Sequence, residues 1–147
     1  MKTILLIMIG LSSLTVAQEA PRFTKANGVV TDSKTTLEWQ DDYSDNGDSI
    51  KLATWTDAID YCEGLTLNGQ SDWRLPNKKE LLSIVDYGTY NPAIRSIFEK
   101  TTSHYYWSST TVASNTRYVW AVYFGHGGTG NLHKSNNGYV RCVRAGQ

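Results

Sequence analysis

The stretch from Thr54 to Leu65, TWTDAIDYCEGL, predicts a helix that carries one of the two cysteines of the chain. Thr54 suits the N-cap position, because Asp57 three residues later completes the pattern of a capping box. Apolar side chains recur at helical spacing and form one face that includes the cysteine: Trp55, Ala58, Ile59, Cys62 and Leu65. We therefore expect the sulfur of Cys62 to point toward the core.

The other cysteine, Cys142, lies in the sequence YVRCVR at residues 139–144. The β-branched residues of this segment predict the last strand of the domain. Side chains alternate across a strand, so Val140 and Cys142 are expected on the same side. Arg141 and Val143 then lie on the opposite side.

Residues 1–17 have the features of a secretory signal peptide. Lys2 is followed by an apolar run from Ile4 to Leu14, which is too short for a bilayer, since a span needs roughly twenty residues. We expect cleavage before Gln18 and export to the periplasm or the exterior, without membrane insertion afterwards; an uncleaved anchor is the alternative. In an oxidising compartment, two cysteines most simply form one disulfide, here between the first helix and the last strand.

The composition of the chain limits its partners. Fourteen basic and fourteen acidic residues balance, and no basic stripe alternates with aromatic residues, so nucleic acid is not expected as a partner. Five Trp and nine Tyr residues stand out. Their large apolar faces with polar groups at the edge suit both a core and a binding surface. Residues 18–147 suffice for one domain with its own core.

Local patterns predict further elements on both sides of the first helix. A hairpin is expected from strands at 29–31 and 36–39, preceded by a polar lead-in at 21–27. Asn77 and Glu80 form a second capping pattern and start a second helix.

The rest of the chain is mainly strand-forming. A short helical turn is expected after Pro92, with Ile94, Ile97 and Phe98 inward. Strands are then expected at these positions, with a glycine-rich turn at 125–130: 105–109, 118–124, 131–134 and 139–144. The strand at 118–124 is apolar on both faces, which is typical of a central, covered strand. These elements predict an α+β domain with two main helices on one twisted, mostly antiparallel sheet.

The order of these landmarks resembles the C-terminal domain family of the Legionella collagen-like adhesin, the Lcl C-terminal domain family. The resemblance spans residues 22–145 and is carried by these segments: Trp39, Tyr61-Cys62, Asp72-Trp73-Arg74-Leu75-Pro76, Glu80-Leu81, Tyr106-Trp107-Ser108-Ser109, Trp120 and Val140-Arg141-Cys142-Val143-Arg144. That family is similar to the C-type-lectin-like fold, in which a cysteine of the first helix bridges to the final strand. The resemblance therefore implies this architecture, with Cys62 and Cys142 as the bridge.

The resemblance also implies a function. The adhesin after which the family is named attaches bacteria to sulfated polysaccharides and forms trimers. We expect an exported, non-enzymatic binding module for a polysaccharide or a surface protein in adhesion-type contacts, and the resemblance allows a homotrimer. The chain carries no Gly-x-y collagen stalk. A structural or assembly subunit of the cell envelope is the alternative.

Two loop regions, 110–117 and 125–138, are rich in small polar residues of the kind that recognition loops use. The candidate ligand-binding residues are Asn115, Arg117, Tyr118, His126, Asn131, His133, Lys134, Asn136 and Asn137. Aromatic stacking and amide hydrogen bonds would recognise a ligand, and Arg117 and Lys134 would meet sulfate or carboxylate groups. Ordinary solvated turns are the alternative.

No metal site or cofactor is expected. The acidic loop from Asp41 to Asp48 does not follow the EF-hand pattern, because Ser44 and Ala53 occupy ligand positions. The calcium-binding tripeptides of true C-type lectins are also absent, although a calcium site of another kind stays an alternative. The three histidines, His104, His126 and His133, lack the spacing of a zinc site.

No catalytic residue is expected either. The chain has no Gly-x-Ser-x-Gly motif. Formylglycine-generating enzymes share a similar fold and work through a reactive cysteine pair, whereas Cys62 and Cys142 match the structural bridge. An enzyme of that kind is therefore kept only as an alternative.

The remaining family landmarks are expected to be structural. We predict core positions for four tryptophans: Trp39, Trp73, Trp107 and Trp120. Arg74 and Arg141 are expected to make structural hydrogen bonds near the core. Trp55, at the first turn of its helix, suits either the core or a ligand.

Overall fold

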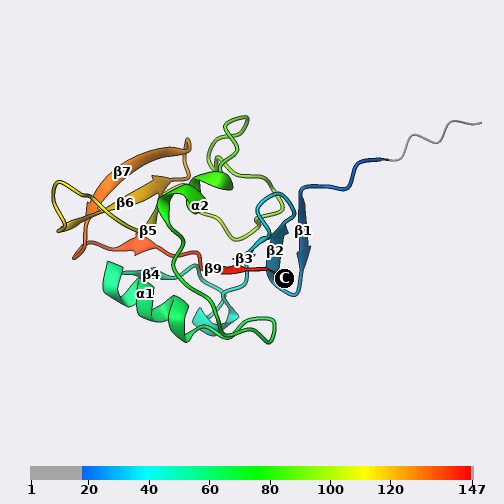
Figure 1. The fold of residues 1–147 in the computed structure, drawn as a ribbon, viewed down its shortest axis with the longest axis horizontal. Coiled ribbons are helices and arrows are strands. Elements are labelled where there is room, and N and C mark those ends of the chain that lie inside the picture. The colour runs from blue at the N-terminus through cyan, green and yellow to red at the C-terminus, as the bar shows by residue number, and fades with distance from the viewer. Residues whose placement is uncertain (1–17, 147) are drawn as a thin grey trace, which may run out of the picture.

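The computed structural model describes residues 18–146, and the predicted signal peptide at 1–17 lies outside this range. Two helices, one 3-10 helix and nine strands follow one another within it (Figure 1). In chain order they are β1 Phe23–Ala26, β2 Val29–Asp32, β3 Leu37–Gln40, η1 Ser44–Asn46, β4 Leu52–Ala53, α1 Trp55–Gly64, α2 Lys78–Ser83, β5 Tyr105–Thr111, β6 Tyr118–Tyr123, β7 Gly128–His133, β8 Gly138–Tyr139 and β9 Val143–Ala145.

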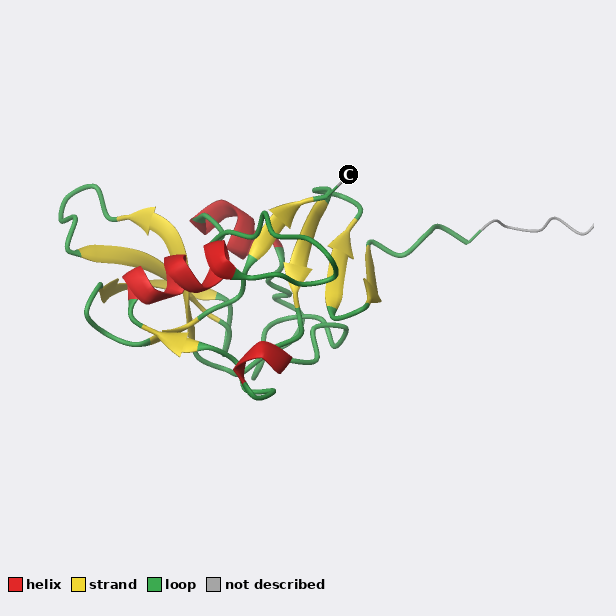
Figure 2. Cartoon of the chain, turned by 90° about the horizontal axis from the view of Figure 1, so that it is seen from below, coloured by secondary structure: helices red, strands yellow, loops and turns green. Residues whose placement is uncertain are grey.

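The strands form two sheets that lie side by side, in place of the one sheet that we predicted (Figure 2). The first sheet has the order β1-β2-β3-β9, and the second has the order β4-β8-β5-β6-β7. Neighbouring strands are antiparallel except for β5 and β8, which are parallel. The predicted α+β class with mostly antiparallel pairing is confirmed.

The predicted hairpin is confirmed, since β2 and β3 pair antiparallel with Val30 opposite Trp39. The polar lead-in at 21–27 is corrected, because it contains the edge strand β1. Phe23 is the only buried side chain of that strand. One inward apolar residue is enough for a short edge strand, but it leaves no recognisable alternation in the sequence.

The last strand is divided between the two sheets (Figure 1). The prediction of one strand over 139–144 is wrong, because residues 140–142 cross from β8 in the second sheet to β9 in the first. Gln40 holds this crossing: its amide donates to the Cys142 carbonyl at 3.0 Å, and its side-chain oxygen accepts from the Cys142 amide at 3.2 Å. The C-terminal segment therefore joins the two sheets.

Both helices begin where the sequence predicted. The Thr54 hydroxyl accepts from the Asp57 amide at 3.5 Å, which caps α1. At α2 the Glu80 amide donates to the Asn77 side chain at 2.8 Å, and the Glu80 carboxylate accepts from the Asn77 amide at 3.3 Å. This reciprocal pair is a complete capping box.

The chain after Pro92 forms no helix: Ile94 lies in a bridge, and a single turn at 96–97 is closed by the Phe98 amide, which donates to the Arg95 carbonyl at 3.0 Å. The Ala93 amide bonds to the carbonyl just after β6 at 2.6 Å, and Ile94 forms a bridge with Val85. A helix directly after Pro92 is therefore prevented, because the backbone of Ala93 and Ile94 pairs with other segments. Ile94 and Phe98 are nevertheless buried, as predicted.

Alternation along β6 sends side chains into two cores on opposite faces of the second sheet. Val119 belongs to the cluster that contains Cys62 of α1. Val122 belongs to the cluster that contains Leu81 of α2. The two helices therefore cover opposite faces of this sheet.

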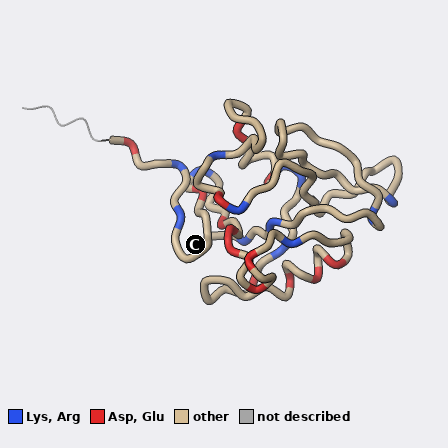
Figure 3. Tube along the Cα trace, turned by 180° about the vertical axis from the view of Figure 1, so that it is seen from behind, with Lys and Arg blue, Asp and Glu red and all other residues tan. Residues whose placement is uncertain are grey.

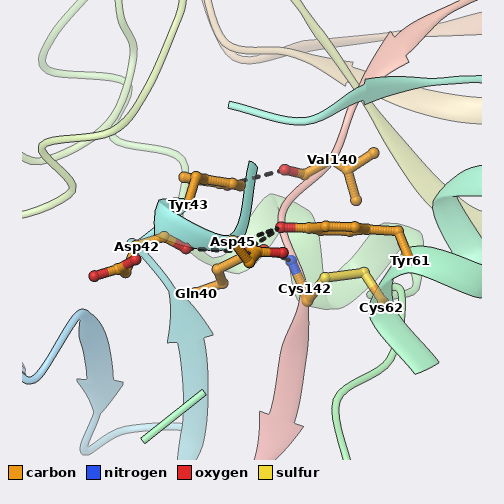
Figure 4. The surroundings of a disulfide bond; sticks show 8 residues. All are labelled: Gln40, Asp42, Tyr43, Asp45, Tyr61, Cys62, Val140 and Cys142. Carbon is orange, nitrogen blue, oxygen red and sulfur yellow. Dashed lines mark hydrogen bonds between the residues drawn. A yellow bond between two sulfur atoms is a disulfide. The ribbon is translucent and has the colours of Figure 1, made fainter. Parts of the chain in front are cut away.

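The predicted disulfide joins Cys62 in α1 to Cys142, the residue before β9, with 5.4 Å between their Cα atoms (Figure 4). Both cysteines are completely buried. The expected orientation of Cys62 toward the core is confirmed.

Three of the four predicted core tryptophans are confirmed, because Trp39, Trp73 and Trp107 are buried. Trp120 is corrected, because its ring is only partly covered. The ammonium group of Lys78 lies over this ring, 3.5 Å from its centroid. Helix α2 is only six residues long, and its first residue covers Trp120 with a charged side chain.

Candidate functional site

Two turns meet at the end of the second sheet where β5 ends and β6 begins. The Lys134 amide donates to the Arg117 carbonyl at 3.0 Å. Tyr118 lies opposite His133, with 5.3 Å between their ring centroids. Seven of the predicted ligand residues gather here, and we call them the polar loop end: Asn115, Arg117, Tyr118, His133, Lys134, Asn136 and Asn137.

The other two predicted residues lie elsewhere. His126 is in the turn between β6 and β7, at the opposite end of the sheet, and Asn131 lies in the middle of β7 opposite Trp120. This separation arises because β7 begins at Gly128, before the predicted strand start at residue 131. Residues 128–133 therefore run along the sheet and do not form a single loop.

The turns of the polar loop end are held by their own hydrogen bonds. The Asn115 side chain accepts from the Arg117 amide at 3.2 Å, and the His133 ring nitrogen lies 2.7 Å from the Ser135 hydroxyl. By contrast, the side chains of Arg117, Asn136 and Asn137 make no hydrogen bond with another described residue, and all three are exposed. These groups remain available to a ligand.

Three cations at this end lack a carboxylate partner among residues 18–146: Arg117, Lys134 and Lys78. The Lys134 ammonium lies 4.2 Å from the centroid of the Trp55 ring. The Lys78 amide donates to the Thr110 hydroxyl at 3.0 Å, which brings this lysine to the same end of the sheet. Contact with an aromatic face holds each ammonium group in place without neutralising its charge.

Sequence reasoning left Lys78 out of the candidate site and left Trp55 undecided. The Trp55 ring donates to the Ser108 carbonyl at 3.0 Å and is partly exposed. The only sequence signal for a role of Trp55 was its position in the first turn of a capped helix. Lys78 gave no signal, because its approach to Trp120 depends on the packing of α2 against β6.

The charge on the two sides of this end differs. Figure 3 shows acidic residues along α1, whereas the loops above it carry basic residues. The exposed acidic side chains of α1 are Asp57, Asp60 and Glu63. The zero net charge therefore conceals a basic loop surface bordered by an acidic helix.

In the acidic loop from Asp41 to Asp48, the first carboxylate, that of Asp41, points into the interior. Asp41 is buried and accepts from Arg141 at 2.9 Å and from Lys25 at 2.7 Å. Asp42 accepts from the amide of Ser44 at 2.8 Å. Within residues 18–146 no three His, Cys, Asp or Glu side chains lie close enough together to hold a metal ion. The predicted structural role of Arg141 is confirmed.

Hydrogen bonds surround the disulfide (Figure 4). The Tyr61 hydroxyl accepts from the Gln40 amide group at 2.8 Å and donates to Asp45 at 3.2 Å. Burial raises the pKa of the Tyr61 hydroxyl well above its usual value, so it stays neutral. Because Cys62 and Cys142 are bonded and buried, neither offers a thiolate to a substrate.

One groove in the described range lies away from these residues. It has a volume of about 760 Å³ and runs between β1 and the segment after α2, with Phe23 and Phe98 in its wall. Its Arg22 already pairs with Asp32 at 2.7 Å. None of the nine predicted ligand residues lines it.

A family model described as the Lcl C-terminal domain matches residues 28–144. This range contains both helices, both cysteines and the whole polar loop end. No curated protein matched the chain. Within residues 18–146 no helix has the length and apolar character needed to span a bilayer.

Proposed function

The chain belongs to the Lcl C-terminal domain family, and on that premise we propose that it is an exported, non-enzymatic module that binds a polysaccharide in adhesion-type contacts. The observation that carries the proposal is a set of three cations, Arg117 and Lys134 of the polar loop end and the neighbouring Lys78, that have no carboxylate partner among residues 18–146. The disulfide, typical of proteins in oxidising compartments, supports export to the periplasm or the exterior. We assign the architecture to the C-type-lectin-like kind.

The proposed ligand carries sulfate or carboxylate groups. The guanidinium of Arg117 offers paired N–H donors to such an anion, and Lys134 and Lys78 add point charges. Tyr118, 37% exposed, offers a ring for a sugar to stack on. The acidic residues of α1 repel a polyanion, so the chain of the polysaccharide crosses the two turns and passes toward α2.

The alternative functions predict different experimental results. A formylglycine-generating enzyme needs a reactive cysteine pair, so alkylation of the native protein would label two thiols; we expect none. A structural subunit would assemble tightly without ligand, which sizing in solution would reveal as a stable oligomer such as a homotrimer. A surface protein as partner would leave glycans unbound.

The first test is a glycan array with the purified protein, run in calcium and again in EDTA. We expect sulfated and carboxylated polysaccharides to bind in both conditions, because the site uses protein cations. Loss of binding in EDTA would indicate that a metal ion is needed. Absence of binding to every acidic glycan would contradict the proposal.

A further inference from the structure

The end of the second sheet opposite the polar loop end carries a continuous group of aromatic rings. We call it the aromatic end, and it consists of His104, Tyr105, Tyr123, His126 and Tyr139. Centroids of the Tyr105 and Tyr123 rings are 4.9 Å apart, and the His126 ring is also 4.9 Å from Tyr123. His104 lies 5.5 Å from Tyr139 and 6.3 Å from Tyr123, so each ring touches the next.

Three of these rings pack against the backbone of glycine residues. A Cβ atom added at Gly130 would lie 2.9 Å from the Tyr105 ring, and one at Gly128 would lie 2.5 Å from the His126 ring. At Gly125 the same atom would lie 2.2 Å from the Tyr123 ring. The rings therefore rest directly on backbone, which fixes their positions before any ligand arrives.

The aromatic end is at least partly exposed, and its tyrosine hydroxyls are free, whereas the His126 Nδ1 accepts from the Gly128 amide at 3.0 Å. His104 and His126 are exposed, and the three tyrosines are partly exposed. The hydroxyls of Tyr105, Tyr123 and Tyr139 make no hydrogen bond with any residue in the range 18–146, and none of them is buried. The five residues of the aromatic end thus combine ring faces with free hydroxyl groups, and none of the five is Asp, Glu, Lys or Arg.

We propose that the aromatic end binds an uncharged saccharide, as a site separate from the polar loop end. Sugars present a C–H face that stacks on aromatic rings and hydroxyls that hydrogen-bond to phenols, and this surface offers both partners. Because these five residues include no Lys or Arg, they offer no permanent cation to a sulfated or carboxylated ligand. A second copy of the chain is disfavoured, because two exposed histidines and three partly exposed tyrosines offer much less than the roughly 800 Å² per partner that stable interfaces bury. The proposal goes beyond the proposed function and stands independently of it.

The test is a calorimetric titration of the purified protein with uncharged hexasaccharides: cellohexaose, maltohexaose, mannohexaose and the hexamer of N-acetylglucosamine. At least one should bind with the same affinity in about 0.1 M and about 1 M salt, where the screening lengths are roughly 10 and 3 Å. Tyr123→Leu should weaken it about tenfold, because one stacking ring is lost, and Tyr123→Phe should weaken it less. Tyr90→Leu is the control, because that tyrosine is 78% exposed and makes no ring contact with the cluster.

His104→Ala and His126→Ala keep the proposal testable if the tyrosine variant does not fold, since both side chains are exposed. His104→Ala should weaken binding at unchanged melting temperature, and His126→Ala should weaken it with at most a small drop, because the exposed turn loses one hydrogen bond. The histidine ring signals of the unaltered protein should shift on titration. Failure of all four saccharides to bind, or affinity unchanged by these substitutions, would overturn the proposal. Arg117→Ala should leave this binding intact, so its outcome separates the aromatic end from the acidic-polysaccharide site.

Discussion

At the residue scale, the ion pair of Asp41 and Arg141 is the most deeply enclosed charge interaction in the described range, with both side chains fully buried. Arg141 also donates to the carbonyls of Gln40 and Lys100, at 2.8 and 2.6 Å. The pair therefore connects the first sheet, the crossing segment and the chain before β5. Its partners are 100 residues apart, and no local pattern indicates that Asp41 belongs with them.

Asp41→Asn should destabilise the fold by about 3–5 kcal/mol, because it leaves a buried guanidinium without its counter-ion. Asp48→Asn in the same loop is the matched control and should be nearly neutral, since Asp48 is exposed and Asn tolerates its positive φ of 61°. Urea unfolding of the two variants gives both values. Equal stability of the two variants would mean that the ion pair contributes little.

Acid should weaken the first sheet through Asp32. Burial alone raises the pKa of Asp32, but hydrogen bonds led by Arg22 and Thr35 outweigh burial and hold its pKa below the usual value. A lowered folded-state pKa contributes stability that is present above the unfolded value of about 4 and is lost as pH falls through the folded value. Melting temperatures should therefore drop below about pH 4. Asp32→Asn should be less stable near neutral pH and show a flatter acid profile; parallel profiles would refute this.

At the element scale, patterns that depend on a few neighbouring residues were predictable. Both helix starts follow from caps within four residues, and the β2–β3 hairpin follows from a short turn. The division of residues 139–144 between two sheets was not predictable, because it depends on Gln40 and on the pairing of β3 with β9. The edge strand β1 escaped prediction because only Phe23 marks its inner face.

Gly138 in β8 shows how closely these elements approach one another. A Cβ atom there would lie 2.8 Å from the Trp107 ring, whose nitrogen donates to the Ala53 carbonyl at 2.8 Å. Gly138→Ala should therefore cost about 1–3 kcal/mol, because the buried ring cannot move freely. Gly64→Ala at the end of α1 has open space and should be neutral or slightly stabilising. Thermal unfolding compares them, and similar melting temperatures would contradict the close packing.

At the scale of the whole molecule, the disulfide joins parts of the chain that are 80 residues apart. Replacing both Cys62 and Cys142 by Ala should cost about 4 kcal/mol in the chain-entropy model. Denaturant unfolding of the double variant measures this cost, and the unaltered protein under reducing conditions should lose a similar amount. A double variant as stable as the oxidised protein would show that packing alone holds α1 against the crossing segment.

The candidate site was predictable only in part. Two loops were recognised by composition, and the structure brings seven of their nine chosen residues to one end. His126 lies at the other end, because glycines at 128 and 130 allow β7 to begin early beneath aromatic rings. Lys78 joins the site through the packing of α2, which local sequence does not encode.

The most direct test of the acidic-polysaccharide proposal measures binding of a sulfated polysaccharide to the Arg117→Ala/Lys134→Ala variant as salt is raised. We expect the unaltered protein to bind and to weaken with salt, and the double variant to bind at least about tenfold more weakly with a smaller salt dependence. Lys34→Ala, an exposed lysine after β2, is the control and should bind normally. Affinity and salt dependence in the double variant equal to those of the control would contradict the account, because the ligand would then bind elsewhere.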